Sequence, residues 1–201
     1  MKLVLLPPWQ LFIKRLIDIT VAIIVAIILS PLIIFTALRV AFSSKGSIFF
    51  LQERVGINGK PFMICKFRSM HTNAEQNGVM LSSEDDKRST PWGKVMRRWR
   101  LDELPQFWNV VKGDMSIVGP RPERKFYIDK IIVTNPEYNN LLQVKPGLTS
   151  LGMVKFGYAK NVEEMIERLQ YDLLYIKNIS LLLDFKIMLQ SIRVVFAGKG
   201  K

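Results

Sequence analysis

Two adjacent carboxylates, Asp102 and Glu103, are the side chains of this sequence whose types and spacing point most directly to chemistry. They open the run Asp-Glu-Leu-Pro, which is typical of a helix start, with Asp102 as the capping residue and Pro105 in the first turn. At such a start, unpaired backbone N–H groups and the helix dipole keep a carboxylate ionised and attract phosphate. The pair also suits Mg²⁺, which proteins hold through one or two carboxylates together with substrate phosphates. The structural alternative, a capping Asp with an exposed Glu beside it, is left open by these residues alone.

Arginines surround this pair in the sequence. Arg97, Arg98 and Arg100 lie just before it, and Arg121 lies in the Gly-Pro-Arg-Pro run after it. An anionic substrate that meets a metal-bearing carboxylate is the arrangement used in phosphoryl chemistry. Solvated surface cations and contacts with lipid headgroups are the alternative for each arginine, and we interpret Arg98 and Arg100 in that way.

Composition narrows the classes of protein that the chain can represent. Its 201 residues predict one domain with an appendage. A single cysteine, Cys65, forms no internal disulfide, and a single histidine, His71, excludes a zinc site built from several His and Cys ligands. A formal net charge of +12 with 49% hydrophobic residues indicates an anionic partner and a lipid surface. Nucleic acid remains a competing explanation of the charge alone.

An apolar segment, residues 16–38, lies near the N-terminus and is long enough to span a bilayer as a straight helix. Asp18 is its single charge, and basic residues flank it on both sides, which favours a cytoplasmic location for both ends. Pro31, after Ser30, has no amide hydrogen for the preceding turn, so we expect the helix to kink or break there.

Two arrangements of this segment are equally open from these observations. One is a re-entrant hairpin, broken at Ser30-Pro31, that enters one leaflet and returns to the same side. The other is an ordinary single-pass anchor with a tolerated proline. A hairpin buried in a globular core is less favoured, because the segment is too uniformly apolar to present a polar face.

The remaining elements are expected to be short. Two strands, within residues 46–54 and 61–70, should pair through a turn at Asn58-Gly59. Thr90 and Pro91 predict a helix start, whereas the two prolines and two glycines of residues 113–122 predict an irregular loop. We also expect a polar loop at residues 71–89, a helix from Asp102 that ends near Gly113, a helix over residues 162–176 capped by Asn161, and a final helix over residues 181–196.

Several motifs follow one another along most of the chain. They are the basic-flanked apolar segment with Ser30-Pro31 and residues 52–56 (QERVG), 66–70 (KFRSM), 101–106 (LDELPQ), 109–116 (NVVKGDMS), 118–122 (VGPRP) and 145–149 (KPGLT). Together they resemble the bacterial sugar transferase family, the monotopic phosphoglycosyl transferases, and in extent the chain resembles the small form of that family. The resemblance covers residues from about 12 to about 196.

The resemblance implies an enzyme that moves a sugar-1-phosphate from a UDP-sugar to polyprenyl (undecaprenyl) phosphate with Mg²⁺ and releases UMP, the initiating membrane step of a bacterial glycan pathway. It assigns Asp102 as the nucleophile that forms an aspartyl-phosphosugar intermediate. Glu103 is implied in metal binding, with Asp102, and in activating the acceptor. Covalent carboxylate catalysis of this kind divides one difficult displacement into two easier ones.

Cations in the family motifs are expected to neutralise the substrate phosphates. Lys66, Arg68, Arg97 and Arg121 are the candidates, because arginine can bind phosphate oxygens in a bidentate manner. The chain departs from the family after the Pro-Gly-Leu-Thr motif, where residues 150–154 read SLGMV and many members have GWAQV. This difference leaves the identity of the sugar open.

The resemblance also favours the re-entrant hairpin. The expected fold is mixed α/β, with a membrane-inserted helix hairpin over residues 1–42 and a catalytic domain over residues 43–201. This domain is expected to have a small sheet and amphipathic helices along the cytoplasmic face of the bacterial inner membrane. Expected partners are membrane lipid and the two substrates, with no nucleic acid; a homodimer and contacts with downstream glycosyltransferases are compatible with the sequence but have no motif of their own.

Two alternatives of other classes are a non-catalytic basic module tethered to the membrane and an inactive scaffold for glycan assembly. The module accounts for the charge and the anchor but not for the Asp-Glu pair among the cations. The scaffold is disfavoured because the pair is intact.

Overall fold

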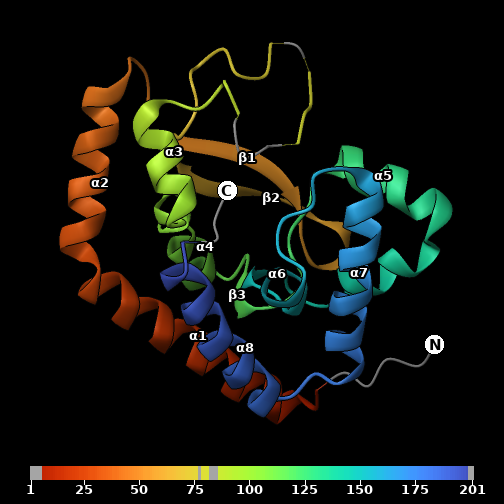
Figure 1. The fold of residues 1–201 in the computed structure, drawn as a ribbon. Helices are drawn as coiled ribbons and strands as arrows, with labels where there is room; N and C mark the ends of the chain where they lie inside the picture. The colour runs from red at the N-terminus through yellow and green to blue at the C-terminus, as the bar shows by residue number, and fades with distance from the viewer. Residues whose placement is uncertain (1–5, 77, 82–85, 199–201) are drawn as a thin grey trace.

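The computed structural model describes residues 6–76, 78–81 and 86–198, and Figure 1 shows them as helices around two small sheets. The helices are α1 (Pro8–Ile28), α2 (Ser30–Ser43), α3 (Pro91–Arg98), α4 (Gln106–Lys112), α5 (Lys125–Thr134), α6 (Leu151–Lys155), α7 (Val162–Lys177) and α8 (Leu181–Phe196). The strands are β1 (Phe49–Val55), β2 (Pro61–Phe67), β3 (Ser116–Val118) and β4 (Gly147–Thr149), and the 3₁₀ turns are η1 (Ile57–Gly59), η2 (Leu101–Glu103) and η3 (Pro136–Gln143). The predicted mixed α/β class is confirmed.

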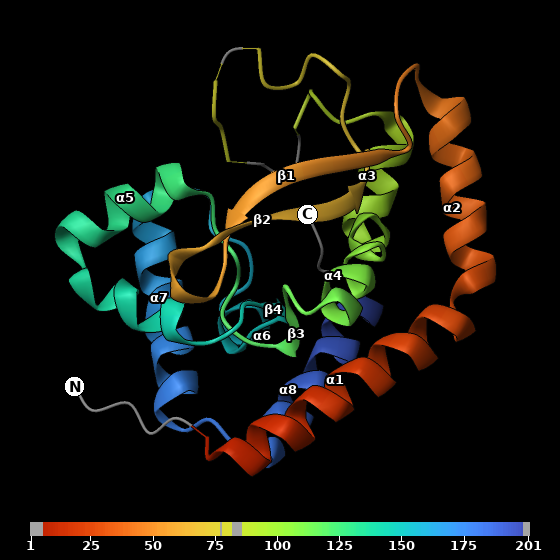
Figure 2. The same ribbon diagram turned by 180° about the vertical axis from the view of Figure 1, so that it is seen from behind.

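The elements surround a central hydrophobic core. Helices α2 and α3 lie on one side of the molecule and α5 and α7 on the other, with β1 and β2 between them (Figures 1 and 2). Figure 2 shows α1 and α8 side by side along the edge opposite to this hairpin. Buried residues such as Val118, Ile131 and Tyr175 form the core between these layers.

The N-terminal apolar segment folds as two helices that meet at an angle of 66°. The break lies at the predicted Ser30-Pro31 position. Because Pro31 has no amide hydrogen to give to the carbonyl of Ile27, that carbonyl accepts a hydrogen bond from the Ser30 hydroxyl at 2.8 Å. Within the described ranges, neither helix reaches the length and hydropathy of a membrane span by itself, whereas the bent pair reaches them together.

Polar contacts attach α1 to the rest of the chain. Asp18 is buried and accepts hydrogen bonds from the Ser116 hydroxyl at 2.7 Å and from the Ile117 amide at 3.0 Å. Lys14, one turn earlier, lies 2.6 Å from Asp184 of α8. The single charge of the apolar segment therefore binds β3, and the preceding lysine binds α8.

Strands β1 and β2 form the antiparallel hairpin that the sequence predicts. Their register runs from Phe49 opposite Phe67 to Val55 opposite Pro61. The turn contains Asn58, which has a left-handed conformation with φ 56°. Of the loop predicted at residues 71–89, the described part contains no helix or strand segment, and residues 77 and 82–85 lie outside the described residues.

The stretch predicted as an irregular loop, residues 113–122, contains a strand instead. Here β3 pairs in parallel with β4, and all three β3 residues are buried. A Cβ atom on Gly119 would lie 2.3 Å from the carbonyl oxygen of Lys145, and one on Gly147 would lie 2.1 Å from the Gly119 nitrogen. Both glycines thus permit a backbone approach that no larger residue allows, and three-residue strands are too short to show periodicity in a sequence.

Helix caps agree with the sequence at several positions. The Thr90 hydroxyl accepts from the Gly93 amide at 2.9 Å, and the Asn161 side chain accepts from the Glu164 amide at 2.7 Å. The predicted helices at 162–176 and 181–196 correspond to α7, which extends one residue further, and to α8.

Candidate active site

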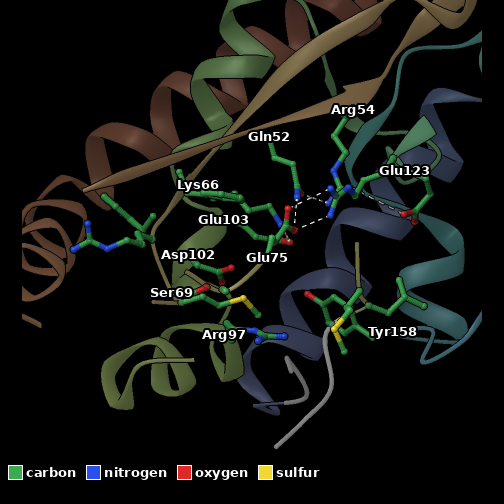
Figure 3. Close-up of a pocket in the computed structure, with 18 of the residues that line it drawn as sticks. Gln52, Arg54, Lys66, Ser69, Glu75, Arg97, Asp102, Glu103, Glu123 and Tyr158 are labelled. Carbon is green, nitrogen blue, oxygen red and sulfur yellow. Dashed lines mark hydrogen bonds and ion pairs between the residues drawn. The ribbon is translucent and has the colours of Figure 1, made fainter. Parts of the chain in front are cut away.

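A pocket of about 390 Å³ lies between the β1–β2 hairpin, η2, the loop after β3 and the segment around Tyr158. This volume is within the range of small-molecule sites. Asp102 and Glu103 from η2 line it together with Lys66 from β2, Arg97 from α3 and Arg121 from the loop after β3. Figure 3 shows side chains from these segments converging on the same space. The structure therefore brings all six of the predicted site residues, Arg68 included, to the lining of one pocket.

Glu103 is the most strongly paired carboxylate of the pocket. Its Oε2 accepts hydrogen bonds from Nη2 and Nε of Arg100 at 2.5 and 3.0 Å, and its Oε1 lies 3.3 Å from Nζ of Lys66 and 3.5 Å from Nη2 of Arg121. Burial alone would raise the pKa of Glu103, but Arg100, Lys66 and Arg121 outweigh it and hold that pKa well below its usual value. These cations therefore favour the ionised form of Glu103.

Asp102 has the opposite environment, although it is the next residue. Its side chain makes no hydrogen bond or ion pair within the described part of the chain. Burial raises the pKa of Asp102 above its ordinary value and the Glu103 carboxylate adds to this rise, while Lys66 and Arg97 oppose it. The Asp102 carboxylate is therefore an unpaired group, lining the pocket, in a positively charged environment.

The backbone before the pair explains how the two carboxylates diverge. Arg100, two residues after the end of α3, has a left-handed conformation with φ 56°. This conformation is unusual for a residue other than glycine. Residues 101–103 then form a 3₁₀ turn, and α4 begins only at Gln106. The predicted helix start at Asp102 is thus wrong, because Asp102 caps nothing; the predicted end near Gly113 is confirmed, with Gly113 at φ 101°.

The other predicted cations differ in what they contact. Lys66, Arg97 and Arg121 have charges that act on the carboxylate pair, and Arg97 also donates to the Ser89 hydroxyl at 2.9 Å. Arg68 borders the same pocket, but its Nη1 and Nη2 donate to the carbonyl oxygens of Ser47 and Ser44, each at 2.5 Å. Its guanidinium is committed to the end of α2, so we do not retain Arg68 as a phosphate ligand.

Sequence reasoning missed Arg100 and Tyr158. Arg100, expected to be a surface cation, is buried against Glu103, and its spacing of three residues from Glu103 was the available signal. Tyr158 lines the pocket, and the guanidinium carbons of Arg121 and Arg100 lie 5.2 and 5.8 Å from its ring centre. It follows the stretch in which the chain departs from the family pattern, and Figure 3 shows it beside the pocket.

Binding of Mg²⁺ in this pocket depends on the carboxylates that line it. Among the described residues, no group of three or more His, Cys, Asp and Glu side chains is arranged to hold a metal ion. Mg²⁺ does not require such a group, since proteins commonly bind it through one or two carboxylates and the phosphates of a substrate. Asp102 and Glu103 fit that second mode, in which the substrate brings most of the oxygen ligands.

The arrangement as a whole suits chemistry at a phosphate ester. An unpaired carboxylate can act as a nucleophile, and fixed cations on either side can neutralise charge that develops on phosphate oxygens. An arrangement of this kind is typical of sites that bind and transfer phosphoryl groups.

Comparison with known proteins gives the family. The profile described as bacterial sugar transferase matches residues 9–198, which is nearly the whole chain. The chain belongs to the bacterial sugar transferase family.

Individual relatives carry more specific names. The UDP-N-acetylgalactosamine-undecaprenyl-phosphate N-acetylgalactosaminephosphotransferase of Aeromonas hydrophila is 44% identical over 197 residues, which are 98% of this chain and 47% of the relative. The UDP-glucose:undecaprenyl-phosphate glucose-1-phosphate transferase of Klebsiella pneumoniae is 39% identical over 93% of this chain and 41% of its own length. This chain thus spans less than half the length of these two relatives. The exopolysaccharide production protein ExoY of Sinorhizobium fredii is 35% identical over 93% of this chain and 87% of that protein.

Proposed function

We propose that this chain is a phosphoglycosyl transferase that moves a sugar-1-phosphate from a UDP-sugar to polyprenyl phosphate and releases UMP. The observation that carries the proposal is the difference between two neighbouring carboxylates. Glu103 is paired with Arg100, Lys66 and Arg121, while Asp102 has no partner among the described residues and lines a cationic pocket. The names of relatives that act on UDP-sugars and undecaprenyl phosphate support the same reaction.

The reaction proceeds in two displacements. In the first, a carboxylate oxygen of Asp102 attacks the β-phosphorus of the UDP-sugar, and the bond from that phosphorus to the bridging oxygen breaks, so that UMP leaves. In the second, an oxygen of polyprenyl phosphate attacks the same phosphorus, and the bond to Asp102 breaks. The product is polyprenyl-diphosphate-sugar, and the Asp102 carboxylate is restored.

Fixed charges support both displacements. Lys66, Arg97 and Arg121 neutralise the phosphate oxygens from positions that need no reorganisation during the reaction. Asp102 and Glu103 would hold Mg²⁺ together with diphosphate oxygens, and the ion would supply further neutralisation of charge. Both oxygens of Glu103 already contact Arg100, Lys66 and Arg121, so we assign Glu103 to positioning these cations instead of removing a proton from the acceptor.

The bent pair α1–α2 fits a re-entrant membrane anchor. Both helices expose large apolar side chains, among them Phe12, Ile27, Phe35 and Phe42, and α8 beside them exposes Leu182, Phe185 and Phe196. We propose that the hairpin enters the cytoplasmic leaflet of the bacterial inner membrane and leaves the rest of the chain on the cytoplasmic face. This placement keeps the pocket near the bilayer surface, where the phosphate of a polyprenyl acceptor lies.

Release of UMP tests the proposal. Purified protein in detergent is incubated with undecaprenyl phosphate, Mg²⁺ and, in turn, UDP-N-acetylgalactosamine, UDP-glucose and UDP-galactose. We expect UMP with one donor, no UMP from Asp102→Asn, and none when EDTA removes Mg²⁺. Unchanged UMP release by folded Asp102→Asn would contradict the assigned nucleophile, and a folded wild-type chain that is inactive with every donor would favour a non-catalytic module.

A further inference from the structure

A second group of polar side chains lies in the same pocket but away from Asp102. Gln52 and Arg54 project from β1, and Arg124 lies at the start of α5. Figure 3 shows Arg54 between Gln52 and Glu123, with Gln52 directed at Glu75. The mechanism described above uses none of these three residues.

Arg54 has less negative charge around it than its burial requires. Its Nη2 donates to Oε1 of Gln52 at 2.6 Å, its Nη1 lies 3.8 Å from Oε2 of Glu123, and its buried Nε has no hydrogen-bond partner in the described structure. Burial lowers the pKa of Arg54 to about 10, and the charges of Arg121 and Arg124 add to this effect while Glu123 opposes it. An anion at this position would relieve the imbalance.

Glu123 does not supply that anion, because it is shared. Its Oε1 accepts from Nη2 of Arg168 at 2.5 Å and lies 3.9 Å from Nε of Arg121. One carboxylate therefore serves three guanidinium groups. Among residues 6–76, 78–81 and 86–198, no acceptor contacts Nε of Arg54.

A carboxylate from another segment already binds the neighbouring groups. Glu75 accepts from both terminal nitrogens of Arg124, at 2.7 and 3.3 Å, and its Oε1 also accepts from Nε2 of Gln52 at 3.2 Å. Two parallel N–H groups directed at two oxygens of one anion is the geometry by which arginine binds phosphate. Glu75 remains partly exposed, so a ligand that enters the pocket can displace it.

We propose that Gln52, Arg54 and Arg124 form a second anion subsite, which binds the nucleotide-side phosphate of a nucleoside diphosphate donor and which Glu75 fills in the unliganded chain. The proposal rests on the proposed function. Arg121 lies between the two subsites, with its Nη2 3.5 Å from Glu103 and its Nε 3.9 Å from Glu123. A diphosphate can therefore extend across Arg121, with the transferred phosphate at Asp102 and the other phosphate at Arg54.

The position of the subsite favours the soluble donor over the lipid acceptor. Arg124 precedes α5, and α5 lies on the opposite side of the molecule from α2 in both views (Figures 1 and 2). The Arg124 end of the subsite therefore belongs to the side of the molecule away from α2. UMP, which carries the nucleotide-side phosphate and lacks the transferred one, is therefore the discriminating probe.

Equilibrium titration of UMP into the 201-residue protein in detergent tests the subsite without any transfer reaction. We expect Glu75→Gln to tighten UMP binding about two- to fivefold, because it removes a competing, partly exposed ion pair. Arg124→Gln and Arg54→Gln should each weaken UMP binding about tenfold or more, the effect of losing a charged hydrogen bond. The matched control is Glu163→Gln, which makes the same charge change at an exposed position on α7 and should leave UMP affinity unchanged.

Circular dichroism and thermal unfolding establish that each variant is folded. If Arg54→Gln does not fold, Arg124→Gln alone tests the subsite. UMP affinity that is the same in wild type, Glu75→Gln and Arg124→Gln would overturn the subsite, as would wild type that binds no UMP. The affinity for undecaprenyl phosphate is measured in the same variants. If Glu75→Gln and Arg124→Gln change the affinity for undecaprenyl phosphate but not the affinity for UMP, the assignment to the donor is overturned. UMP release from a donor is measured separately. If the wild type transfers sugar phosphate but Glu75→Gln and Arg124→Gln bind UMP as the wild type does, this inference is wrong and the proposed function stands.

Discussion

The guanidinium of Arg100 directs two nitrogens at a single oxygen of Glu103, with Nη2 at 2.5 Å and Nε at 3.0 Å. This contact leaves the other oxygen of Glu103 to Lys66 and Arg121. Glu103 thus takes the close contacts of Arg100 and Lys66, whose charges also act on Asp102. The availability of the Asp102 carboxylate follows from this arrangement.

Loss of the Glu103 charge should destabilise the fold strongly. Glu103→Gln leaves the buried Arg100 and the half-buried Lys66 and Arg121 without their shared anion, and we expect it to reduce the free energy of unfolding by about 3–5 kcal/mol. Denaturant unfolding measures this change. Asp129→Asn is the control, because its pair with Lys125 is exposed and should change stability by less than about 1 kcal/mol. Equal effects of the two substitutions would refute the role given to Glu103.

Asp102→Asn should have the opposite effect on stability. The pKa of Asp102 is raised in the folded state, so folding is favoured when Asp102 is protonated. This contribution to stability is complete below the pKa of the unfolded chain, about 3.9, and is lost as the pH rises through the pKa of the folded state. Asn resembles the protonated form at every pH. We therefore expect Asp102→Asn to raise the melting temperature at pH 7 and the gain to shrink as pH falls toward 4. Thermal unfolding across this range checks the expectation, and a lower melting temperature for Asp102→Asn at pH 7 would show that Asp102 is paired.

The contact between Lys14 and Asp184 should hold α1 against α8. Lys14→Met leaves the buried Asp184 without its cation, and we expect a loss of about 3–5 kcal/mol in unfolding free energy. Lys186→Met changes an exposed lysine of the same helix α8 and should have little effect. The double variant Lys14→Met with Asp184→Asn should recover part of the loss; no recovery would mean that the charge pair is not the cause.

The re-entrant arrangement is open to a labelling test. The chain has a single cysteine, so Cys65→Ser provides a cysteine-free background. Gln10→Cys, in the first turn of α1, and Lys45→Cys, after α2, are then labelled in intact cells with a membrane-impermeant reagent. We expect both positions to be protected until the cells are opened, because both should be cytoplasmic. Labelling of one position alone in intact cells would indicate a spanning helix.

Local features of this fold were predictable from sequence because they depend on nearby residues. The Thr90 cap, the β1–β2 hairpin and the break at Pro31 each follow from a short run of residue types. The Ser30 hydroxyl that serves the Ile27 carbonyl belongs to the same local chemistry.

The features that sequence reasoning missed depend on distant contacts. Arg68 binds carbonyl groups of Ser44 and Ser47, more than twenty positions away, so its motif gave no sign that it would be occupied. Asp102 satisfies the rules for a helix cap, but the left-handed Arg100 and its contact with Glu103 place the pair in a 3₁₀ turn. The pairing of β3 with β4 joins residues that are 31 positions apart in the sequence, such as Ser116 and Gly147, and two glycines permit it.

Intact-protein mass spectrometry tests the central claim, that Asp102 forms a covalent bond to phosphorus. The protein is incubated with Mg²⁺ and the UDP-sugar that supports UMP release, without polyprenyl phosphate, and is quenched before its mass is measured. We expect an increase equal to one sugar phosphate on the wild-type chain, located at Asp102 by peptide mapping, and no increase on Asp102→Asn. Transfer to the acceptor by a wild-type chain that never gains this mass, or an adduct that persists in Asp102→Asn, would contradict the account.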